Sequence, residues 1–516
     1  MTPPAAVHET HVGLVLLYGD RAYKLKKPVR NAFLDFSSPA RRRAALVREL
    51  ELNRRLAPDV YLGLSHVGPV TEPGVRPDGT AAGDGAADDG AADDEPLLVM
   101  RRMPADRRLS TLARDGVPVD GPLRDLGRLM AVFHARAERN DRICVDGGRD
   151  ALAVRWADNL AQLEPFRDLV LDGSVIDELG WLSRRFLAGR GPLLEQRVAG
   201  GRIVDGHGDL VADDVFCLDD GPRVLDCLEF DDHLRHVDVL DDVAFLAMDL
   251  ERLARPDLAA LFLAAYAEFS GDEPPPALLH HYIAYRAVVR AKVECLRHAQ
   301  GAEPAAAAAR RYAALGLDHL RTGAVRLALV GGLPGTGKST VAGALADRFG
   351  AVLLSTDPLR KETAGLDPQQ PAPAAFRDGL YTPDRTDQTY SMLLHRAGEL
   401  LARGESVILD ASWTHAEHRS AAGRLADDHC ADLVALQCRA RPETAATRIR
   451  TRRRTPSDAS PAIAAAMDAA ADPWPQALPV DTERPTQRTL DRAACAWHGA
   501  AHHAAETVRR RAPQRP

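Results

Sequence analysis

The chain has 516 residues, of which 45% are hydrophobic, and its formal net charge is -7 at pH 7. This length exceeds what a single hydrophobic core organises, so we expect two or three domains. The net acidic charge gives no overall basic field, and composition therefore does not favour nucleic acid as an obligatory partner. The start MTPPAAVHET lacks an export signal, and no apolar stretch is long enough to span a bilayer. The seven scattered cysteines form no Cys-x-x-Cys pair, which predicts a cytoplasmic protein with reduced thiols.

The first predicted elements are two strands in VGLVLLYGDRAYKLKK, joined at Gly19 and Asp20. A helix follows across residues 39–56, where apolar residues recur at helical spacing. Residues 72–95 are Gly, Ala and Asp with almost nothing apolar to bury, so we expect a disordered loop that interrupts a domain. After it, LLVMRR predicts a strand and residues 123–134 predict an amphipathic helix.

Acidic residues gather in DGHGDLVADDVFCLDDGPRVLDCLEF, at residues 205–230. Here VFCL and RVLD predict two strands joined by a turn over residues 219–222. If Leu218 pairs with Arg223, Val215 lies opposite Asp226.

That register places Asp214 at the mouth of the hairpin, where Asp214 and Asp226 could share one Mg²⁺. Asp209, on the loop that enters the hairpin, would then point at an acceptor hydroxyl as a general base. The alternative is an acidic loop and hairpin whose aspartates are solvated.

The helix-prone run of residues 303–323 ends just before the apolar strand VRLALVGG, so we place a domain boundary near residue 325. Beyond it, strand and helix patterns alternate, which predicts an α/β domain with a parallel sheet. The predicted domains are therefore residues 1–325 and 326–505, followed by a basic tail at 506–516.

Residues 332–339, GLPGTGKS, fit Gly-x4-Gly-Lys-[Ser/Thr] directly after an apolar strand and directly before a helix-forming run. In this context the glycines let backbone N–H groups surround phosphate oxygens, while Lys338 reaches the terminal phosphates. The Ser339 hydroxyl can ligate Mg²⁺. The motif predicts an ATP and Mg²⁺ site made by Gly332, Pro334, Gly335, Thr336, Gly337, Lys338, Ser339 and Thr340.

Further candidate residues follow the phosphate loop. STDPLRKE places Asp357 and Arg360 at the carboxyl edge of the sheet, where Asp357 could accept a proton from a substrate hydroxyl. Asp410, at the end of VILDASW, is predicted to hold the water shell of Mg²⁺. In RPETAATRIRTRRR, Arg448 and Arg452 are candidates to fold over the transferring phosphoryl group. Asp357 could instead be a helix cap, and the arginines a solvated face.

Taken together, GGLPGTGKST, STDPLRKE, VILDASW and the arginine helix resemble the small P-loop kinase group of gluconate kinases, zeta toxins and polynucleotide kinases. The resemblance covers about residues 326–460. It implies that Asp357 engages the acceptor hydroxyl and that Arg448 or Arg452 is a lid arginine.

The N-terminal part resembles the aminoglycoside phosphotransferase and choline kinase group. His207-Gly-Asp209-Leu matches the catalytic loop of that group, Asp226 its metal-binding acid, and Asp242 the acid that opens the following helix. The resemblance implies a two-lobed α+β fold of the protein-kinase type, here fused to the α/β P-loop domain.

The same resemblance implies that Lys24, in RAYK, holds ATP phosphates and pairs with Glu49, while Lys26 lies on the same strand face and is a second candidate. The chain departs from the pattern at Val211 and Asp214, where the group usually shows His and Asn. Asn can donate a hydrogen bond as well as ligate Mg²⁺, whereas an ionised Asp only accepts.

These features predict an ATP-dependent phosphotransferase with two nucleotide-binding domains, which passes the γ-phosphoryl of ATP to a hydroxyl of a small sugar-like or aminocyclitol-like acceptor. Two alternatives stay open: a catalytically silent N-terminal module, which Asp214 favours, and a P-loop that hydrolyses ATP to drive a conformational change. A polynucleotide acceptor is supported only by the arginines of residues 448–454. The identity of the acceptor and the oligomeric state are left open.

Overall fold

The computed structural model describes residues 5–9, 13–30, 35–67, 94–367, 370, 377–451 and 459–511, and for 500–511 the backbone alone. Most of the predicted disordered loop, residues 72–93, lies outside these ranges. Contacts divide the chain into two compact units, residues 1–148 with 201–273 and residues 149–200 with 274–516. The boundary expected near residue 325 falls inside the second unit and stays a prediction.

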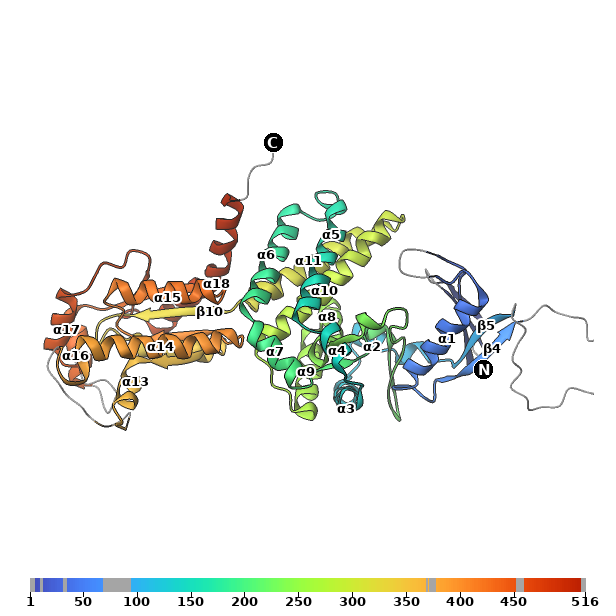
Figure 1. Ribbon diagram of the computed structural model, residues 1–516, viewed down its shortest axis with the longest axis horizontal. Coiled ribbons are helices and arrows are strands. Elements are labelled where there is room, and N and C mark those ends of the chain that lie inside the picture. Colours follow the sequence, from blue (N-terminus) through green and yellow to red (C-terminus); the bar gives the residue numbers. More distant parts are fainter. Residues whose placement is uncertain are drawn as a thin grey trace, which may run out of the picture. The chain divides into compact units, whose positions relative to one another are not determined.

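An antiparallel sheet with the strand order β1-β2-β3-β5-β4 forms one part of the first unit (Figure 1). The strands are β1 (Ala6–Glu9), β2 (Gly13–Tyr18), β3 (Arg21–Lys26), β4 (Tyr61–Val67) and β5 (Glu95–Arg101). Helix α1 (Pro39–Asn53) begins after Ser38, whose side chain accepts a hydrogen bond from the Arg41 backbone N–H. Leu46 of α1 packs with Ala22 and Leu98 of the sheet in one buried cluster.

The rest of the first unit is mainly helical. Its helices are α2 (Leu109–Arg114), α3 (Asp120–Arg136), α4 (Asp141–Asp146), α8 (Val239–Arg252) and α9 (Pro256–Ser270), with single turns η1 (Ala105–Arg107), η3 (Ala212–Asp214) and η4 (Asp232–Leu234). Two short antiparallel pairs join β6 (Ile203–Asp205) to β9 (His236–Asp238) and β7 (Val215–Leu218) to β8 (Gly221–Val224). The unit therefore combines a strand-rich part with a helical part, as predicted.

The register predicted for the β7–β8 hairpin is wrong. Leu218 pairs with Gly221, so the turn has only the two residues 219–220 instead of four. Gly221, the first residue after the turn, takes a positive φ of 118°, which glycine adopts without strain. Asp226 consequently lies past the end of the hairpin and not opposite Val215.

The second unit contains a group of helices: α5 (Arg149–Leu163), α6 (Gly173–Gly189), α7 (Gly191–Ala199), α10 (Pro276–Ala299) and α11 (Glu303–Thr322), with the single turn η2 (Glu164–Phe166). Helix α11 packs along α10 and also contacts α6.

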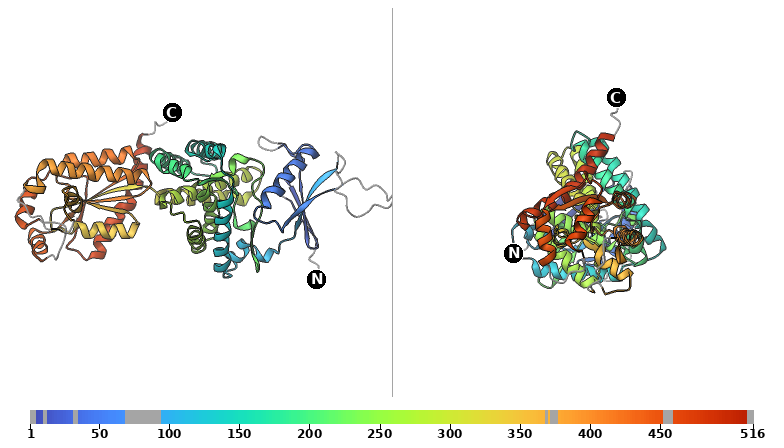
Figure 2. Two further views of the ribbon diagram at one scale, coloured as in Figure 1. Left: turned by 60° about the horizontal axis from the view of Figure 1, so that its bottom comes forward. Right: turned by 90° about the vertical axis from the view of Figure 1, so that its left-hand side faces the viewer.

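The second unit also contains a five-stranded parallel sheet, with the order β11-β12-β10-β13-β14. Its strands are β10 (Arg326–Gly331), β11 (Val352–Ser355), β12 (Val407–Asp410), β13 (Asp432–Arg439) and β14 (Leu478–Asp481). Helices lie on both sides of it (Figure 2): α12 (Lys338–Phe349) and α18 (Thr486–Arg511) contact one set of strands, and α14 (Pro383–Ala402) and α15 (Ala416–Asp428) cover the other face. Shorter helices are α13 (Thr356–Thr363), η5 (Gly379–Tyr381), α16 (Pro442–Thr451) and α17 (Pro461–Ala469). The predicted parallel α/β sheet is confirmed, while the expected basic tail begins within α18.

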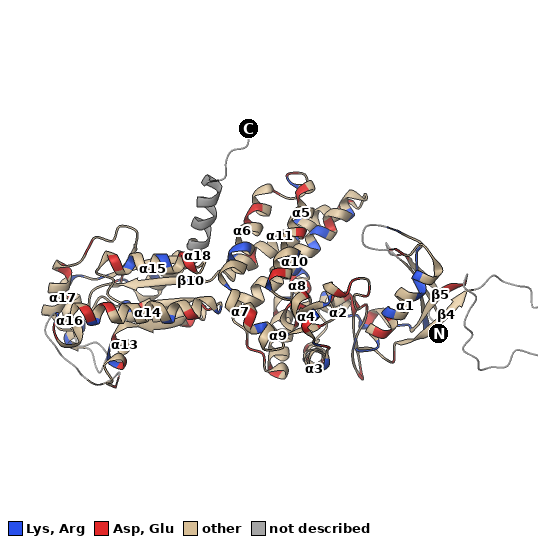
Figure 3. Ribbon diagram, viewed as in Figure 1, with Lys and Arg blue, Asp and Glu red and all other residues tan. Residues whose placement is uncertain are grey.

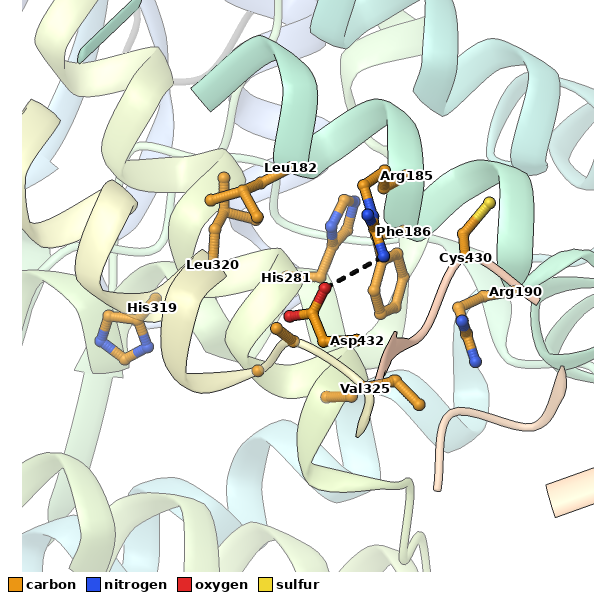
Figure 4. Close-up of a pocket in the computed structure, with 13 residues that line it drawn as sticks. Leu182, Arg185, Phe186, Arg190, His281, His319, Leu320, Val325, Cys430 and Asp432 are labelled. Atoms are coloured by element: carbon orange, nitrogen blue, oxygen red, sulfur yellow. Dashed lines mark hydrogen bonds and ion pairs between the residues drawn. The ribbon is translucent and has the colours of Figure 1, made fainter. Parts of the chain in front are cut away.

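Inside the second unit, a small cavity lies where α6, α10 and α11 meet the segment that starts β13 (Figure 4). Its volume of about 30 Å³ has room for one or two water molecules and not for a nucleotide. Arg185 of α6 donates a hydrogen bond to Asp432 of β13 over 3.0 Å, and the buried Arg190 donates to the His429 carbonyl oxygen. These contacts attach the start of β13 to the helices of the same unit.

Candidate active sites

The loop between β10 and α12 folds back on itself through glycines with positive φ. Gly332, Gly335 and Gly337 have φ of 144°, 82° and 84°. A Cβ on Gly332 would lie 2.5 Å from Thr336 Oγ1, and one on Gly335 would lie 2.5 Å from the Ala445 carbonyl oxygen. Only glycine fits both positions, and the loop leads straight into the N-terminus of α12, a geometry suited to phosphate.

Asp410 ends β12 close to this loop and is 6% exposed. Ser355 Oγ donates to its Oδ2 over 3.3 Å, while Oδ1 has no hydrogen-bond partner among the described residues. Burial raises the pKa of Asp410, and Lys338 and Ser339 act against that rise. A buried carboxylate oxygen without a donor, beside a serine hydroxyl, fits the oxygen ligands of Mg²⁺.

A cavity of about 420 Å³ opens beside the phosphate loop, within the size range of small-ligand sites. Lys338 and Pro334 line it together with Asp357 and Arg360 of α13. Arg360 Nη1 lies 3.1 Å from Asp357 Oδ1, and its guanidinium lies over the Tyr381 ring at 4.5 Å. The structure thus brings the predicted phosphate lysine and the predicted base to one cavity.

Another part of the cavity lining combines residues that the sequence did not single out. The rings of Tyr390 and His418 stack with centroids 3.9 Å apart, and His418 Nε2 lies 2.8 Å from Asp387 Oδ1. The Tyr390 hydroxyl accepts a hydrogen bond from the Trp413 backbone N–H over 3.1 Å. These side chains come from α14 and α15, and no local motif links them, so only the fold reveals the group.

Arg448 of α16 is held beside the phosphate loop through Thr482. Its guanidinium donates to Thr482 Oγ1 over 3.0 Å and to the Thr482 carbonyl oxygen over 2.8 Å. Thr482 Oγ1 in turn donates to the Thr336 carbonyl oxygen over 2.7 Å. Arg452 lies outside the described residues. The lid role of either arginine stays a prediction.

In the first unit, Lys24 and Lys26 of β3 share the buried Glu49 of α1. Each Nζ lies 2.7 Å from a different carboxylate oxygen of Glu49. Lys24 also contacts Asp226 over 2.7 Å, and Lys26 contacts Glu229. Burial opposes the charge on Lys24, but Asp226 and Glu49 outweigh it and hold the pKa of Lys24 well above its usual value. The predicted Lys24–Glu49 ion pair is confirmed, and Lys26 makes a second one.

The loop with His207, Gly208 and Asp209 is fixed by Asp242 of α8. The backbone N–H groups of His207 and Gly208 donate to the two oxygens of Asp242 over 2.7 and 2.9 Å. His134 Nε2 lies 3.1 Å from the same carboxylate. Burial alone would raise the pKa of Asp242, but the hydrogen bond and charge of His134 hold that pKa well below its ordinary value. Asp242 therefore orders the loop that carries Asp209.

The carboxylates of Asp209, Asp214 and Asp226 interact electrostatically at this loop. Burial, together with the charges of Asp226 and Asp209, raises the pKa of Asp214 well above its usual value. Lys24 lowers the pKa of Asp226, which takes the left-handed φ of 63°. A divalent cation would relieve the carboxylate repulsion, so Asp214 and Asp226 fit a Mg²⁺ site.

A phosphate loop with its aspartates in one unit, and a Lys24–Glu49 pair with an Asp242-anchored loop in the other, define the chain as an ATP-dependent kinase. It joins a domain of protein-kinase type to a P-loop kinase domain. None of the described helices combines the length and apolar character that a bilayer span requires.

The chain is 44% identical over 494 residues to protein Rv2004c of Mycobacterium tuberculosis, covering 96% of this chain and 95% of that protein. It belongs to the family of this mycobacterial protein. A family model described as an AAA domain matches residues 327–474.

Among solved structures, a gluconokinase from Sinorhizobium meliloti is 18% identical, covers 36% of this chain and 97% of its own, and has a TM-score of 0.26. A choline/ethanolamine kinase family protein from Mesorhizobium loti is 16% identical, covers 62% of this chain and 93% of its own, and has a TM-score of 0.38.

Proposed function

We propose that the chain transfers the γ-phosphoryl group of ATP, with Mg²⁺, to a hydroxyl of a small sugar-like or aminocyclitol-like acceptor. One observation carries the proposal: Lys338 of the phosphate loop and the carboxylate of Asp357 line the same cavity. A cavity of about 420 Å³ gives an acceptor of this size room beside the phosphates.

ATP with Mg²⁺ supplies the phosphoryl group, and the residues of the chain supply position and charge. Lys338 and the loop N–H groups would neutralise the phosphates, and Ser339 and Asp410 would hold the cation. Asp357 would take the proton of the acceptor hydroxyl, a role that typically contributes about 10²- to 10⁴-fold in rate. Arg360 would orient the Asp357 carboxylate through their contact of 3.1 Å.

The first unit would provide a second centre of the same reaction type. Lys24 would contact ATP phosphates, Asp214 and Asp226 would hold Mg²⁺, and Asp209 would act as the base. The alternative is a first unit that binds or regulates without catalysis. Asp214 favours this alternative, because its carboxylate adds negative charge where ATP would lie.

We further propose that the acceptor is a small molecule and that the protein acts in the cytoplasm, where ATP is supplied. Acidic and basic residues are interspersed on α14 and α15 (Figure 3), rather than forming a basic stripe along these helices. A mixed surface of this kind gives a nucleic acid backbone little to bind.

The test is phosphate transfer from radiolabelled ATP to a panel of sugars, aminoglycosides and short RNA. It compares the full chain with Lys338→Met, with Asp209→Asn and with the double variant. We expect acceptor labelling that falls strongly in Lys338→Met and to background in the double variant. ATP hydrolysis without labelling of any acceptor would contradict the kinase proposal, and unchanged labelling in Asp209→Asn would favour the silent module.

A further inference from the structure

Two histidines and an aspartate meet in the first unit, at residues to which the proposed reaction gives no role. Asp146 ends α4, His233 lies in η4 and His236 opens β9. Asp146 Oδ2 lies 2.9 Å from His233 Nδ1 and 2.8 Å from His236 Nδ1. Each residue offers one ligand atom, and the three ligand atoms lie within 4.8 Å of one another.

We propose that Asp146, His233 and His236 form a binding site for a divalent transition metal ion, Zn²⁺ by preference. Two imidazole nitrogens and one carboxylate oxygen are a donor set that suits Zn²⁺, whereas Mg²⁺ prefers oxygen alone. Tetrahedral Zn²⁺ with bonds of about 2.0–2.2 Å keeps its ligands about 3.3–3.5 Å apart. If the Asp146 oxygen and each histidine nitrogen moved about 0.5 Å further apart, the three residues could coordinate the ion, with water as the fourth ligand.

Two of the three ligands are held in place before any ion binds. His236 pairs with Asp205 in the β6–β9 ladder. Gly147, directly after Asp146, packs so closely on this ladder that a Cβ there would lie 2.9 Å from the His236 carbonyl oxygen and closer still to Ile203. The side chains of Asp146 and His236 are 15% and 8% exposed, whereas that of His233 is 57% exposed. The site is thus preorganised on one side and open on the other, so an ion can enter without unfolding.

The positive charge of Arg142 would weaken the binding of a metal ion at this site. Arg142 Nε lies 3.7 Å from Asp146 Oδ2, and the Arg142 side chain is 70% exposed. An exposed side chain can turn into solvent when a cation binds, but its charge weakens the site until it does. Removing that charge is expected to tighten metal binding at least about fivefold, which is the effect of two unit charges about 4 Å apart in water, because the ion carries two charges.

The position of the cluster indicates a structural role. His233 and His236 lie on either side of Arg235, which donates to Asp205 Oδ1 over 2.8 Å and to the Leu228 carbonyl oxygen over 2.9 Å. Leu228 donates its backbone N–H to the His207 carbonyl oxygen. An ion bound here would fasten to α4 the segment that braces the His207 loop, without touching ATP or its acceptor.

The experiment titrates the metal-stripped full chain with Co²⁺ as a spectroscopic probe and then with Zn²⁺, in excess Mg²⁺ so that the kinase centres do not compete. We expect one site per chain, with the visible absorption of tetrahedral Co²⁺ that Zn²⁺ abolishes, and a higher melting temperature with metal. His233→Ala should weaken binding at least about tenfold, because it removes one of three protein ligands. Arg142→Ala should tighten it.

The matched control is His395→Ala, because His395 is also an exposed histidine beside a carboxylate but belongs to no cluster of three among the described residues. Binding equal in the unchanged chain and in His233→Ala would overturn the proposal, as would a Co²⁺ spectrum without tetrahedral absorption. His233 is exposed, so a folding defect is not expected to obscure its result. His236→Ala serves as a second variant, with circular dichroism to establish that it folds.

Discussion

A single buried carboxylate, Asp242, fixes the backbone of the loop that leads to Asp209. It accepts two backbone N–H groups and faces His134. Asp242→Asn keeps the shape of the side chain but replaces one carboxylate oxygen by an NH₂ group, which cannot accept a hydrogen bond from a backbone N–H. We therefore expect the free energy of unfolding to fall by about 3 kcal/mol. Urea unfolding of the full chain measures the loss, with Asp241→Asn as the neighbouring variant of the same helix turn.

The same contacts predict how this loss depends on pH. The pKa of Asp242 is lower in the folded chain than in the unfolded chain, where it lies near about 3.9. The stabilisation by Asp242 is therefore complete above about pH 4 and disappears as the pH falls through the lower folded pKa. The stability difference between the unchanged chain and Asp242→Asn should shrink in acid, and a difference that grows in acid would contradict this account.

Asp209 and Asp214 are expected to respond differently to the same substitution. Asp214→Asn should retain Mg²⁺-dependent ATP binding, because Asn still offers an oxygen and relieves the repulsion from Asp226. Asp209→Asn should spare binding but remove transfer, because it removes the base and no metal ligand. Both are measured in the Lys338→Met background, where the P-loop centre is silent. If the background chain shows no transfer, the first unit is not a kinase centre and its aspartates are structural.

At the scale of elements, Lys24 and Lys26 join β3 to α1, because both form an ion pair with Glu49. Lys26→Met would leave Glu229 without its cation at a nearly buried position, so a loss of about 3–5 kcal/mol is expected. Lys24→Met should cost less stability, because Lys26 still neutralises Glu49, but it should weaken ATP binding to the first unit. Nucleotide titration and thermal unfolding of the two variants, each combined with Lys338→Met, separate these effects. Equal ATP affinity in both would remove Lys24 from the nucleotide site.

The elements also show what sequence can and cannot predict here. The phosphate loop and the strands around it were predictable because their signals are local: a motif, an apolar run and a helical period. The β7–β8 register could not be predicted in this way, because a different turn length shifts every residue pair of the hairpin. The stack of Tyr390 on His418 and the cluster at Asp146 join separate elements, so their geometry exists only after folding.

At the scale of the whole molecule, the second unit unites the P-loop sheet with helices that precede residue 325 in the chain. The Arg185–Asp432 pair joins those helices to β13, and the Arg190 bond to the His429 carbonyl oxygen joins them to the end of α15. Burial raises the pKa of Asp432, and the charge of Arg185 opposes this rise most strongly. The start of β13 therefore has an ion-pair partner outside the predicted P-loop domain.

Cutting the chain at about residue 325 tests that dependence. Each piece contains its own proposed nucleotide site and an apolar cluster, so we expect two folded pieces. Residues 326–516 should keep the ATP binding that depends on Lys338. That piece loses Arg185, but Asp432 becomes exposed to solvent. The net loss in the free energy of unfolding should therefore be about 1–2 kcal/mol, or roughly 2–8 °C in melting temperature for a domain of this size.

Arg185→Ala in the full chain should lower the melting temperature similarly, while Arg184→Ala, at an exposed neighbouring position, should not. Aggregation of both pieces would show that the boundary is misplaced, and equal transitions for the two arginine variants would show that the pair does not stabilise the unit.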